Sequence, residues 1–154
     1  TGGFTQVCLQ RGAARVYAVD VGRGQLHPKL AADPRVVSLE GVDARDLAAD
    51  LIPDAPDLIV TDVSFIGLAK ALPDALALAQ PGADLVALVK PQFEVGPEAV
   101  GKGGLVKDEA ARAKALADVA AFLASSGWRV RASADSPIAG GDGNREYLLW
   151  AQKA

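Results

Sequence analysis

The sequence predicts an α/β fold in which a mostly parallel sheet carries one late antiparallel strand. Short runs rich in Val, Leu and Ala alternate with segments of helical spacing over most of the chain. These runs are almost continuously apolar, which is typical of parallel strands that are covered on both faces. Near the end, two strand-like runs are joined by a loop too short for a helical crossover, so we expect them to pair antiparallel.

Several segments have the composition of strands. The first two end at an acid, Asp20 and Glu40, and a glycine turn follows each of them. The last two flank the short loop 135–145. The predicted strands span 15–20, 35–40, 58–62, 85–90, 128–131 and 146–150.

The clearest helix is predicted from Asp108 to about Ser125, where small and apolar residues recur at helical spacing. Asp108 is the expected N-cap and Gly127 the expected C-terminal stop. Pro73 is expected in the first turn of another helix, which ends near residues 81–82. A further helix is expected to follow the glycines at the start of the chain and to reach Gly12.

The start of the chain departs from the usual order. In an α/β protein a strand normally leads into the first glycine turn, but here Gly2 and Gly3 come first. A central parallel strand cannot be left out without unpaired backbone groups in the core. The sequence therefore predicts a first strand upstream of Thr1 that is missing from this chain.

Composition limits the class of protein. The 154 residues, half of them hydrophobic, suit one compact domain spanning 1–154. No apolar run is long enough to span a bilayer, and the start lacks the pattern of a signal peptide. With Cys8 as the single cysteine, a cytoplasmic protein is expected. The net charge of −3 argues against autonomous RNA binding, because phosphate affinity normally comes from Lys and Arg.

Open α/β sheets bind ligands at the carboxyl ends of their strands. Asp20, at the end of a strand, has the place and chemistry to accept both hydroxyls of a bound ribose; a solvated strand-end acid is the alternative. Asp43 can accept an adenine amino group, and a helix N-cap before Ala44 is the equally favoured and compatible alternative. The residues expected at this edge are Gly2, Gly3, Asp20, Asp43, Asp62 and Lys90.

Seven motifs carry a resemblance to a known family, in its order and spacing. They are TGGFT (1–5), LQRGA (9–13), VYAVDVG (16–22), VTDVSFI (60–66), KPQFE (90–94), GKGG (101–104) and GNREY (143–147). With these motifs the chain resembles the catalytic domain of TlyA-type proteins, which are FtsJ-like rRNA 2′-O-methyltransferases often labelled haemolysins. The resemblance implies the Rossmann-like S-adenosylmethionine-dependent methyltransferase fold, whose sheet has the pattern predicted above.

The resemblance also implies the activity and its residues. The cofactor is S-adenosyl-L-methionine and the substrate is ribosomal RNA, methylated at the ribose of a cytidine. The catalytic set falls on Asp62, Lys90 and Glu146, while a further family lysine lies upstream of the glycine motif and is absent here. From their places at the sheet edge, the residues expected to contact the cofactor are Gly2, Gly3, Asp20, Asp43 and Asp62. An upstream RNA-binding domain is expected to supply the partner surface, with no membrane and no metal involved.

The chemistry explains these residue types. A ribose hydroxyl must lose its proton as it attacks the methyl group of a sulfonium, and a neutral lysine can accept that proton. We expect Lys90 to be the base, with Asp62 and Glu146 as orienting and electrostatic partners. The alternative is an ordinary salt-bridge cluster at a sheet edge. The alternative functions are a membrane-active haemolysin, a methyltransferase for a small molecule, or an inactive cofactor-binding remnant.

Other residues suggest sites that the sequence does not support. Segment 96–102 resembles the start of a phosphate-binding loop, but Gly103 follows where Ser or Thr is needed. A mobile loop over the active site, with Lys102 near a phosphate, is the better interpretation, and an inert surface loop is close behind it. His27 has no metal-ligand neighbours and is expected to begin a helix at Pro28 or to line the cofactor pocket. Core packing is expected for Cys8, Trp128 and Trp150.

Overall fold

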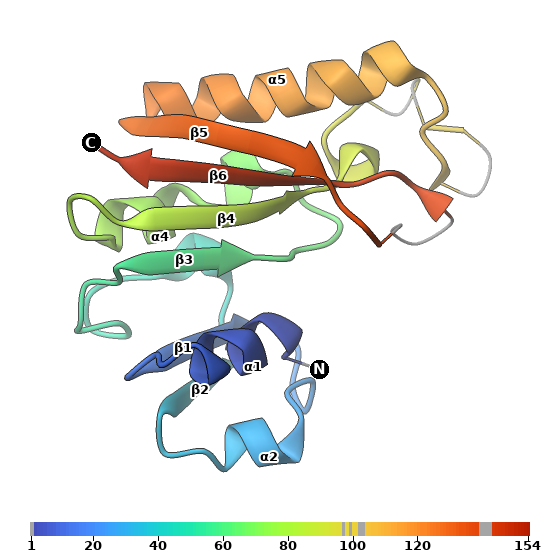
Figure 1. Ribbon diagram of the computed structural model, residues 1–154. Helices are drawn as coiled ribbons and strands as arrows, with labels where there is room; N and C mark the ends of the chain where they lie inside the picture. Colours follow the sequence, from blue (N-terminus) through green and yellow to red (C-terminus); the bar gives the residue numbers. More distant parts are fainter. Residues whose placement is uncertain (1, 97, 99, 102–103, 139–142) are drawn as a thin grey trace. The chain divides into compact units, whose positions relative to one another are not determined.

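The structure is a computed structural model that describes residues 2–96, 98, 100–101, 104–138 and 143–154. Its contacts group the chain into two compact units, Thr1–Asp54 and Ala55–Ala154. Each unit has its own sheet and its own helices (Figure 1). The single domain expected over residues 1–154 stays a prediction, as does a first strand upstream of it.

The first unit is built on a parallel pair of strands. β1 (Val16–Asp20) pairs with β2 (Val36–Glu40), and the register places Asp20 opposite Glu40 at the carboxyl end. Two helices and a 3-10 turn complete the unit: α1 (Gly3–Gln10), α2 (Pro28–Ala31) and η1 (Ala44–Asp46). Both strand predictions and the helix after the glycines are therefore confirmed.

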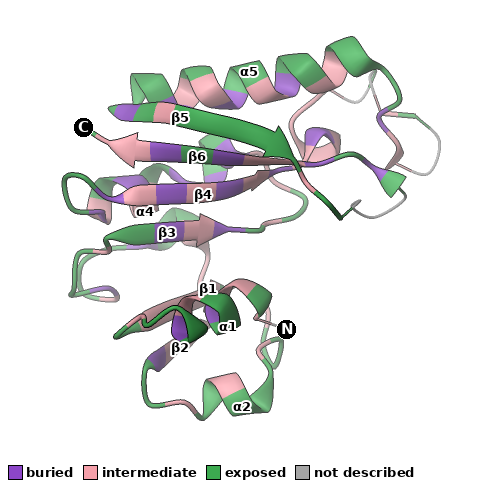
Figure 2. Ribbon diagram, viewed as in Figure 1, coloured by how far each residue is buried: buried purple, intermediate pink, exposed green. Residues whose placement is uncertain are grey.

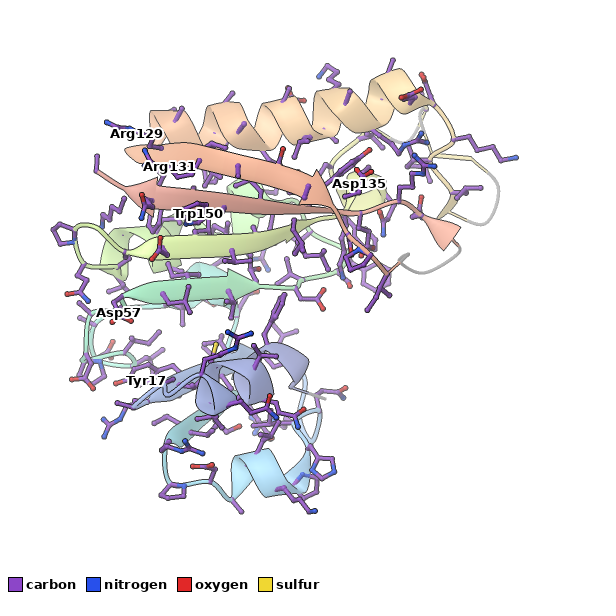
Figure 3. All side chains as sticks on the ribbon, in the orientation of Figure 1. Tyr17, Asp57, Arg129, Arg131, Asp135 and Trp150 are labelled. Carbon is purple, nitrogen blue, oxygen red and sulfur yellow. The ribbon has the colours of Figure 1, made fainter. Side chains whose placement is uncertain are left out.

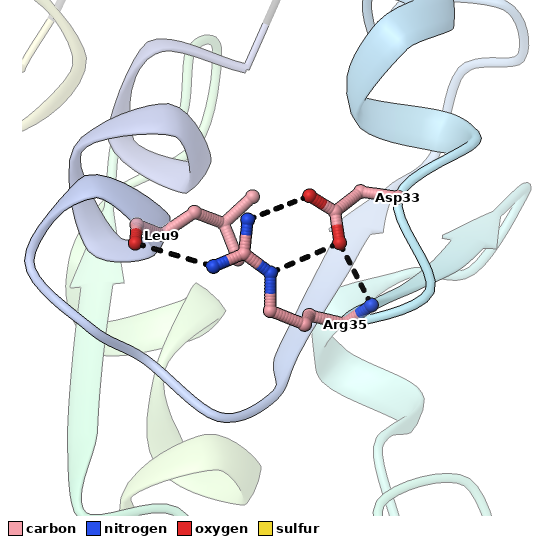
Figure 4. Close-up of polar contacts among 3 residues, drawn as sticks. All are labelled: Leu9, Asp33 and Arg35. Carbon is pink, nitrogen blue, oxygen red and sulfur yellow. Dashed lines mark hydrogen bonds and ion pairs between the residues drawn. The ribbon is translucent and has the colours of Figure 1, made fainter.

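Arg35 links three parts of this unit. Its Nε and Nη2 atoms donate to the Asp33 carboxylate at 3.0 and 2.8 Å, and Nη1 donates to the Leu9 carbonyl at 3.4 Å (Figure 4). The Leu9 carbonyl is near the end of α1, where helix carbonyls lack intrahelical partners. The guanidinium therefore ties the end of α1 to the turn that starts β2.

Glycine is required where α1 begins. Gly2 has φ 92°, and a Cβ added there would lie 2.5 Å from Leu26 Cδ1 and 2.7 Å from Leu30 Cδ1. Any side chain would meet both the left-handed backbone penalty and these leucines. His27 caps α2, since its Nδ1 accepts the Lys29 N–H at 3.1 Å, so the predicted start at Pro28 is confirmed.

The second unit carries the sheet that the sequence predicts. Its strand order is β3-β4-β6-β5, with β3 parallel to β4 and with β6 antiparallel to both of its neighbours. The last strand of the chain therefore lies inside the sheet, and it is the one that runs against the others. The strands are β3 (Leu58–Thr61), β4 (Asp84–Val89), β5 (Trp128–Asp135) and β6 (Tyr147–Lys153).

Helices cover one face of this sheet. They are α3 (Leu68–Ala71), α4 (Pro73–Leu78) and α5 (Glu109–Ser125). Alternate residues of the central strands β4 and β6 are buried, whereas the outer surface of α5 is exposed (Figure 2). The buried core includes Leu68, Leu76, Leu85, Ala87, Val89, Leu123, Trp128, Leu149 and Ala151.

The helix ends largely follow their expected signals. Asp108 caps α5 by accepting the Ala110 N–H at 3.0 Å, and Gly127 takes the left-handed conformation (φ 82°) just past its end. Pro73 occupies the first turn of α4. That helix ends at Leu78, earlier than expected, because the backbone at Ala79 is extended.

The two tryptophans differ in how far they are buried. Trp128 is 2% exposed and packs in the core as predicted. The prediction for Trp150 was wrong: its side chain on β6, labelled in Figure 3, is 42% exposed. Its indole N–H donates to Asp84 at 2.8 Å. The hydrogen bond keeps the polar edge of the ring at the surface. Cys8 lies in α1 as expected, but it is half-buried, and burial raises the pKa of its thiol.

Candidate active site

Two predicted catalytic residues meet at the carboxyl edge of the second sheet. Asp62 follows β3 and Lys90 follows β4, and parallel neighbours bring such residues to the same edge. The Lys90 ammonium lies 2.5 Å from Asp62 Oδ1 and donates to Ser64 Oγ at 3.2 Å. The Lys90 side chain is only 13% exposed, while Asp62 is 50% exposed. The ion pair is therefore held at the rim of the unit.

Glu146 reaches the same edge from the antiparallel strand. It comes just before β6, whose first residue, Tyr147, pairs with Val89 at the end of β4. The Glu146 side chain is buried, with 6% exposure, and its Oε2 accepts the Gln92 amide N–H at 2.9 Å. The three predicted catalytic residues thus all lie where β4 ends, and Gln92 joins them although the sequence interpretation did not single it out.

A pocket of about 380 Å³ opens beside these groups, near the lower end of the usual range for small-ligand sites. It combines an ammonium, a carboxylate, two amides and two aromatic rings, which suits a polar ligand that has to lose a proton. A larger groove of about 600 Å³ between α5 and β5 is mostly apolar, and Arg129 is its one ionisable side chain among the described residues, so it lacks this chemistry. The smaller pocket is lined by Ser64, Phe65, Lys90, Gln92, Phe93, Val100, Gly104, Asn144 and Glu146.

Phe65 has an unusual conformation beside this pocket. Its φ of 64° makes it the single non-glycine residue with positive φ among the described residues, and its side chain is 90% exposed. The ring lies 5.0 Å from that of Phe93, centroid to centroid, at a tilt of 53°. A large apolar residue held in a left-handed backbone and left in solvent costs stability, which marks it as a functional candidate. Nothing in its local sequence signals this conformation.

Two side chains fix the turns around the pocket. Glu94 Oε1 accepts the Leu68 N–H at 2.8 Å, and burial raises the pKa of Glu94 above its ordinary value. Asn144, 2% exposed, accepts the Val106 N–H and donates to the Gly104 carbonyl, both at 2.9 Å. The segments after β3 and β4, and the one before α5, are therefore anchored by the side chains of Glu94 and Asn144.

The first unit places the predicted cofactor residues at the carboxyl end of its own sheet. Asp20 is exposed, and its Oδ1 accepts the Gly22 N–H at 2.9 Å, while its backbone carbonyl accepts the Val42 N–H at 3.1 Å. Within the described part of the chain, no hydrogen bond to Asp20 Oδ2 is seen. Gly3 starts α1, and a Cβ added there would have no atom within 4 Å, so this glycine is not required by packing.

Asp43 has the structural role that the sequence analysis offered as its alternative. It caps η1 by accepting the Arg45 N–H at 2.9 Å, and the Arg45 guanidinium binds both carboxylate oxygens. The Arg45 hydrogen bonds lower the pKa of Asp43 to about 2. An adenine contact at Asp43 stays a prediction, and it requires the amino group to share a carboxylate that Arg45 already occupies.

Some predictions fall outside what the structure describes. Lys102 and Gly103, on which the phosphate-loop comparison and the proposed closing loop depend, are among the residues not described. Within the described ranges, no group of three or more His, Cys, Asp and Glu side chains is arranged to hold a metal ion. No helix in the described part of the chain is both long and apolar enough to cross a membrane.

The chain is 51% identical over 150 residues to the 16S/23S rRNA (cytidine-2′-O)-methyltransferase TlyA of Mycobacterium tuberculosis, a match that covers 97% of this chain and 56% of the relative. A structure from Streptococcus thermophilus that is named as a hemolysin superposes with a TM-score of 0.95 at 44% identity, over 100% of this chain and 56% of that one. The chain thus spans just over half the length of these relatives.

More distant structures agree on the fold. A structure described as an S-adenosylmethionine-dependent methyltransferase from Listeria monocytogenes gives a TM-score of 0.70 at 15% identity, over 99% of this chain and 88% of that one. At that identity the likeness concerns the fold alone, and it confirms the predicted Rossmann-like methyltransferase fold. The model of the FtsJ-like methyltransferase family matches residues 1–153. The chain therefore belongs to the FtsJ-like methyltransferase family.

Proposed function

We propose that this chain is the methyl-transferring part of an rRNA 2′-O-methyltransferase that uses S-adenosyl-L-methionine and acts on a cytidine ribose. The observation that carries the proposal is the Lys90 ammonium, held by Asp62 and Ser64 beside a pocket that Glu146 also lines. The family and the TlyA relative support the reaction class. A cytoplasmic location follows from ribosomal RNA as the substrate.

Lys90 has the position of a general base. S-adenosylmethionine supplies an electrophilic methyl group on a positively charged sulfur. Lys90 would first lose its ammonium proton to water; as the ribose 2′-oxygen then bonded to that methyl carbon and the methyl–sulfur bond broke, the hydroxyl proton would pass to the neutral Lys90 amine, which would become an ammonium again. Asp62 and Ser64 then hold this ammonium where it is formed. Glu146 adds a second negative charge at the pocket wall, which favours the cationic product.

Some of the residues predicted to contact S-adenosylmethionine have the chemistry for that role in this structure. Asp20 has one carboxylate oxygen without a hydrogen bond in the described structure, and this oxygen suits a ribose hydroxyl. Gly2 takes the left-handed conformation that begins α1, and a Cβ there would meet Leu26 and Leu30, so its backbone is the part that can contact the cofactor. We therefore assign cofactor contacts to Gly2, Gly3, Asp20, Asp43 and Asp62, with Asp43 shared between Arg45 and the ligand.

RNA recognition needs more than this chain shows. Its net charge of −3 gives little attraction for phosphates, and it spans 56% of the TlyA relative. We propose that an RNA-binding domain elsewhere in the whole protein supplies the basic surface. Phe65, exposed beside the pocket, then offers its ring to a nucleotide base, since aromatic side chains stack on unpaired bases.

The test uses the full-length protein with labelled cofactor and purified 30S and 50S subunits. The wild type is expected to place label on a cytidine ribose. Lys90→Met is expected to reduce the turnover by about 100-fold or more while cofactor binding is retained, as for loss of a general base. Lys114→Met removes an exposed lysine of α5 that pairs with Asp118, and it should leave turnover unchanged. Bound cofactor without any ribose label would contradict the proposal.

The hemolysin name of the Streptococcus thermophilus structure suggests a second function, membrane lysis. Leakage from liposomes by pure full-length protein tests it directly, and lysis that survives Lys90→Met would separate it from methyl transfer. A methyltransferase for a small molecule is a third possibility, given the pocket of about 380 Å³. Transfer to free cytidine as fast as to ribosomal subunits would favour it.

A further inference from the structure

We propose that Gln92 is a positioning residue of the active site: its side-chain amide fixes the Glu146 carboxylate at the pocket wall without neutralising it. This inference rests on the proposed methyl transfer. The direct observation is the hydrogen bond of 2.9 Å from Gln92 Nε2 to Glu146 Oε2, between residues 54 positions apart in the chain. Both side chains line the pocket that also contains Lys90.

The burial of Glu146 makes such a partner necessary. The side chain is 6% exposed, and a buried carboxylate is stable only when hydrogen bonds replace the water that it has lost. In the part of the chain that the structure describes, Gln92 gives the one hydrogen bond that this carboxylate receives. An Arg or Lys in its place would cancel the charge, whereas an amide holds the carboxylate and leaves its charge available to the reaction.

The orientation of the Gln92 amide leaves its own oxygen without a hydrogen bond in the described part of the chain, and this supports a positioning role for Gln92. Gln92 Oε1 is buried and has no hydrogen-bond partner among the described residues. Turning the amide over would place this oxygen against the carboxylate and the donor away from it. Buried acceptors without a partner are rare, and they call for a specific reason where they occur. Here the amide satisfies Glu146 at the expense of its own oxygen.

The backbone explains how one turn serves both sides of the site. Gln92 lies in the 3-10 turn η2 (Pro91–Phe93), directly after Lys90, and the Phe93 N–H donates to the Lys90 carbonyl at 2.9 Å. Pro91 is buried and its ring restricts the backbone of the turn. Lys90 therefore faces Asp62 and Ser64 while Gln92 faces Glu146, so that a single rigid turn sets the spacing between the base and the second carboxylate.

The experiment compares Gln92→Met, Gln92→Ala and Gln92→Glu in the full-length protein. Met keeps most of the side-chain volume and removes the donor, so kcat should fall by about 10- to 100-fold, the usual effect of losing a hydrogen bond to a charged group. The affinity for S-adenosylmethionine and the KM for ribosomal subunits should stay within about 2-fold, since no binding contact is assigned to Gln92. Gln80→Ala, an exposed glutamine of the same unit, is the matched control.

Gln92→Glu gives a readout that a purely structural role would not move. Two facing carboxylates share a proton at low pH and repel each other once both are ionised. Its kcat relative to wild type should therefore decline as pH rises, whereas that of Gln92→Met should stay proportional to wild type. Wild-type kcat in Gln92→Met, or parallel losses of kcat, cofactor affinity and thermal stability, would overturn the proposal. If Gln92→Ala does not fold, Gln92→Met decides. An inactive wild type would instead refute the proposed function.

Discussion

The Glu94 carboxylate accepts the Leu68 N–H at 2.8 Å, and this bond ties the turn after β4 to the first residue of α3. Gly67 precedes that residue, and a Cβ there would lie 3.3 Å from Glu94 Oε2, so the carboxylate sits close against the helix start. The turn after β3, which carries Asp62 and Ser64, leads into this helix. Glu94 therefore helps to fix the two turns that carry the Lys90–Asp62 pair.

Removing this cap should weaken the second unit. Glu94→Ala is expected to lower the free energy of unfolding by about 1–2 kcal/mol, the usual cost of losing a helix cap made by a charged acceptor. Tryptophan fluorescence in urea measures it, because both tryptophans lie in the Ala55–Ala154 unit. Glu98→Ala, at an exposed position, is the control. An equal midpoint for Glu94→Ala and wild type would contradict the cap.

The same residue gives a pH dependence whose sign follows from its burial. Burial raises the pKa of Glu94 above 4.5, so the folded state binds this proton more tightly than the unfolded state does. Protonated Glu94 therefore stabilises the fold below pH 4.5, and this contribution to the free energy of unfolding is lost as pH rises through the raised pKa. Relative to Glu94→Gln, wild type should lose stability across that window. Parallel stability curves for the two proteins would show that Glu94 does not titrate in this way.

Lys153 supports the end of α4 from the last strand. Its ammonium donates to the carbonyls of Leu76 and Ala79 at 2.9 and 2.6 Å, where the helix leaves carbonyls without partners. Lys153→Met should lower the free energy of unfolding by about 1–3 kcal/mol, because it leaves these partly buried acceptors unpaired. Lys114→Met, which breaks a solvent-exposed ion pair with Asp118, should leave the free energy of unfolding almost unchanged. Urea unfolding of both variants makes the comparison, and equal losses would refute the capping role.

A feature of the fold or the site could be predicted from the sequence when it depends on residues close together in the chain or on a general rule of sheet geometry. The strands, the α5 caps at Asp108 and Gly127, and the proline start of α4 depend on local chemistry, and they were predicted. Lys90 and Asp62 were predicted to meet because parallel strands end at one edge. Gln92 was missed because its partner Glu146 is 54 positions away, and the exposure of Trp150 depends on its place on the sheet.

The first unit should lose stability in acid through one carboxylate. Hydrogen bonds from Arg35 lower the pKa of Asp33 from 3.8 to about 2. The ionised form is thus favoured by folding, so its contribution is present above pH 3.8 and is lost as pH falls towards 2. Amide protection factors of β1 and β2, measured over this range, should fall in wild type and stay flatter in Asp33→Asn. Asp50→Asn, at an exposed position, should follow wild type.

We expect the conformation of Phe65 to lower the stability of the fold while its ring contributes to RNA binding. Its φ of 64° costs roughly 1–2 kcal/mol in a residue that is not glycine, and its 90% exposed ring recovers little by burial. Asn tolerates this conformation, so Phe65→Asn should raise the free energy of unfolding by about 1 kcal/mol. If the ring stacks on a base, the same change should raise the KM for ribosomal subunits by about 5-fold to 100-fold, with cofactor affinity unchanged. Ile138→Asn, which also removes an exposed apolar side chain, should leave that KM unchanged. A more stable Phe65→Asn protein with wild-type KM would mean that the strained conformation serves something other than RNA binding.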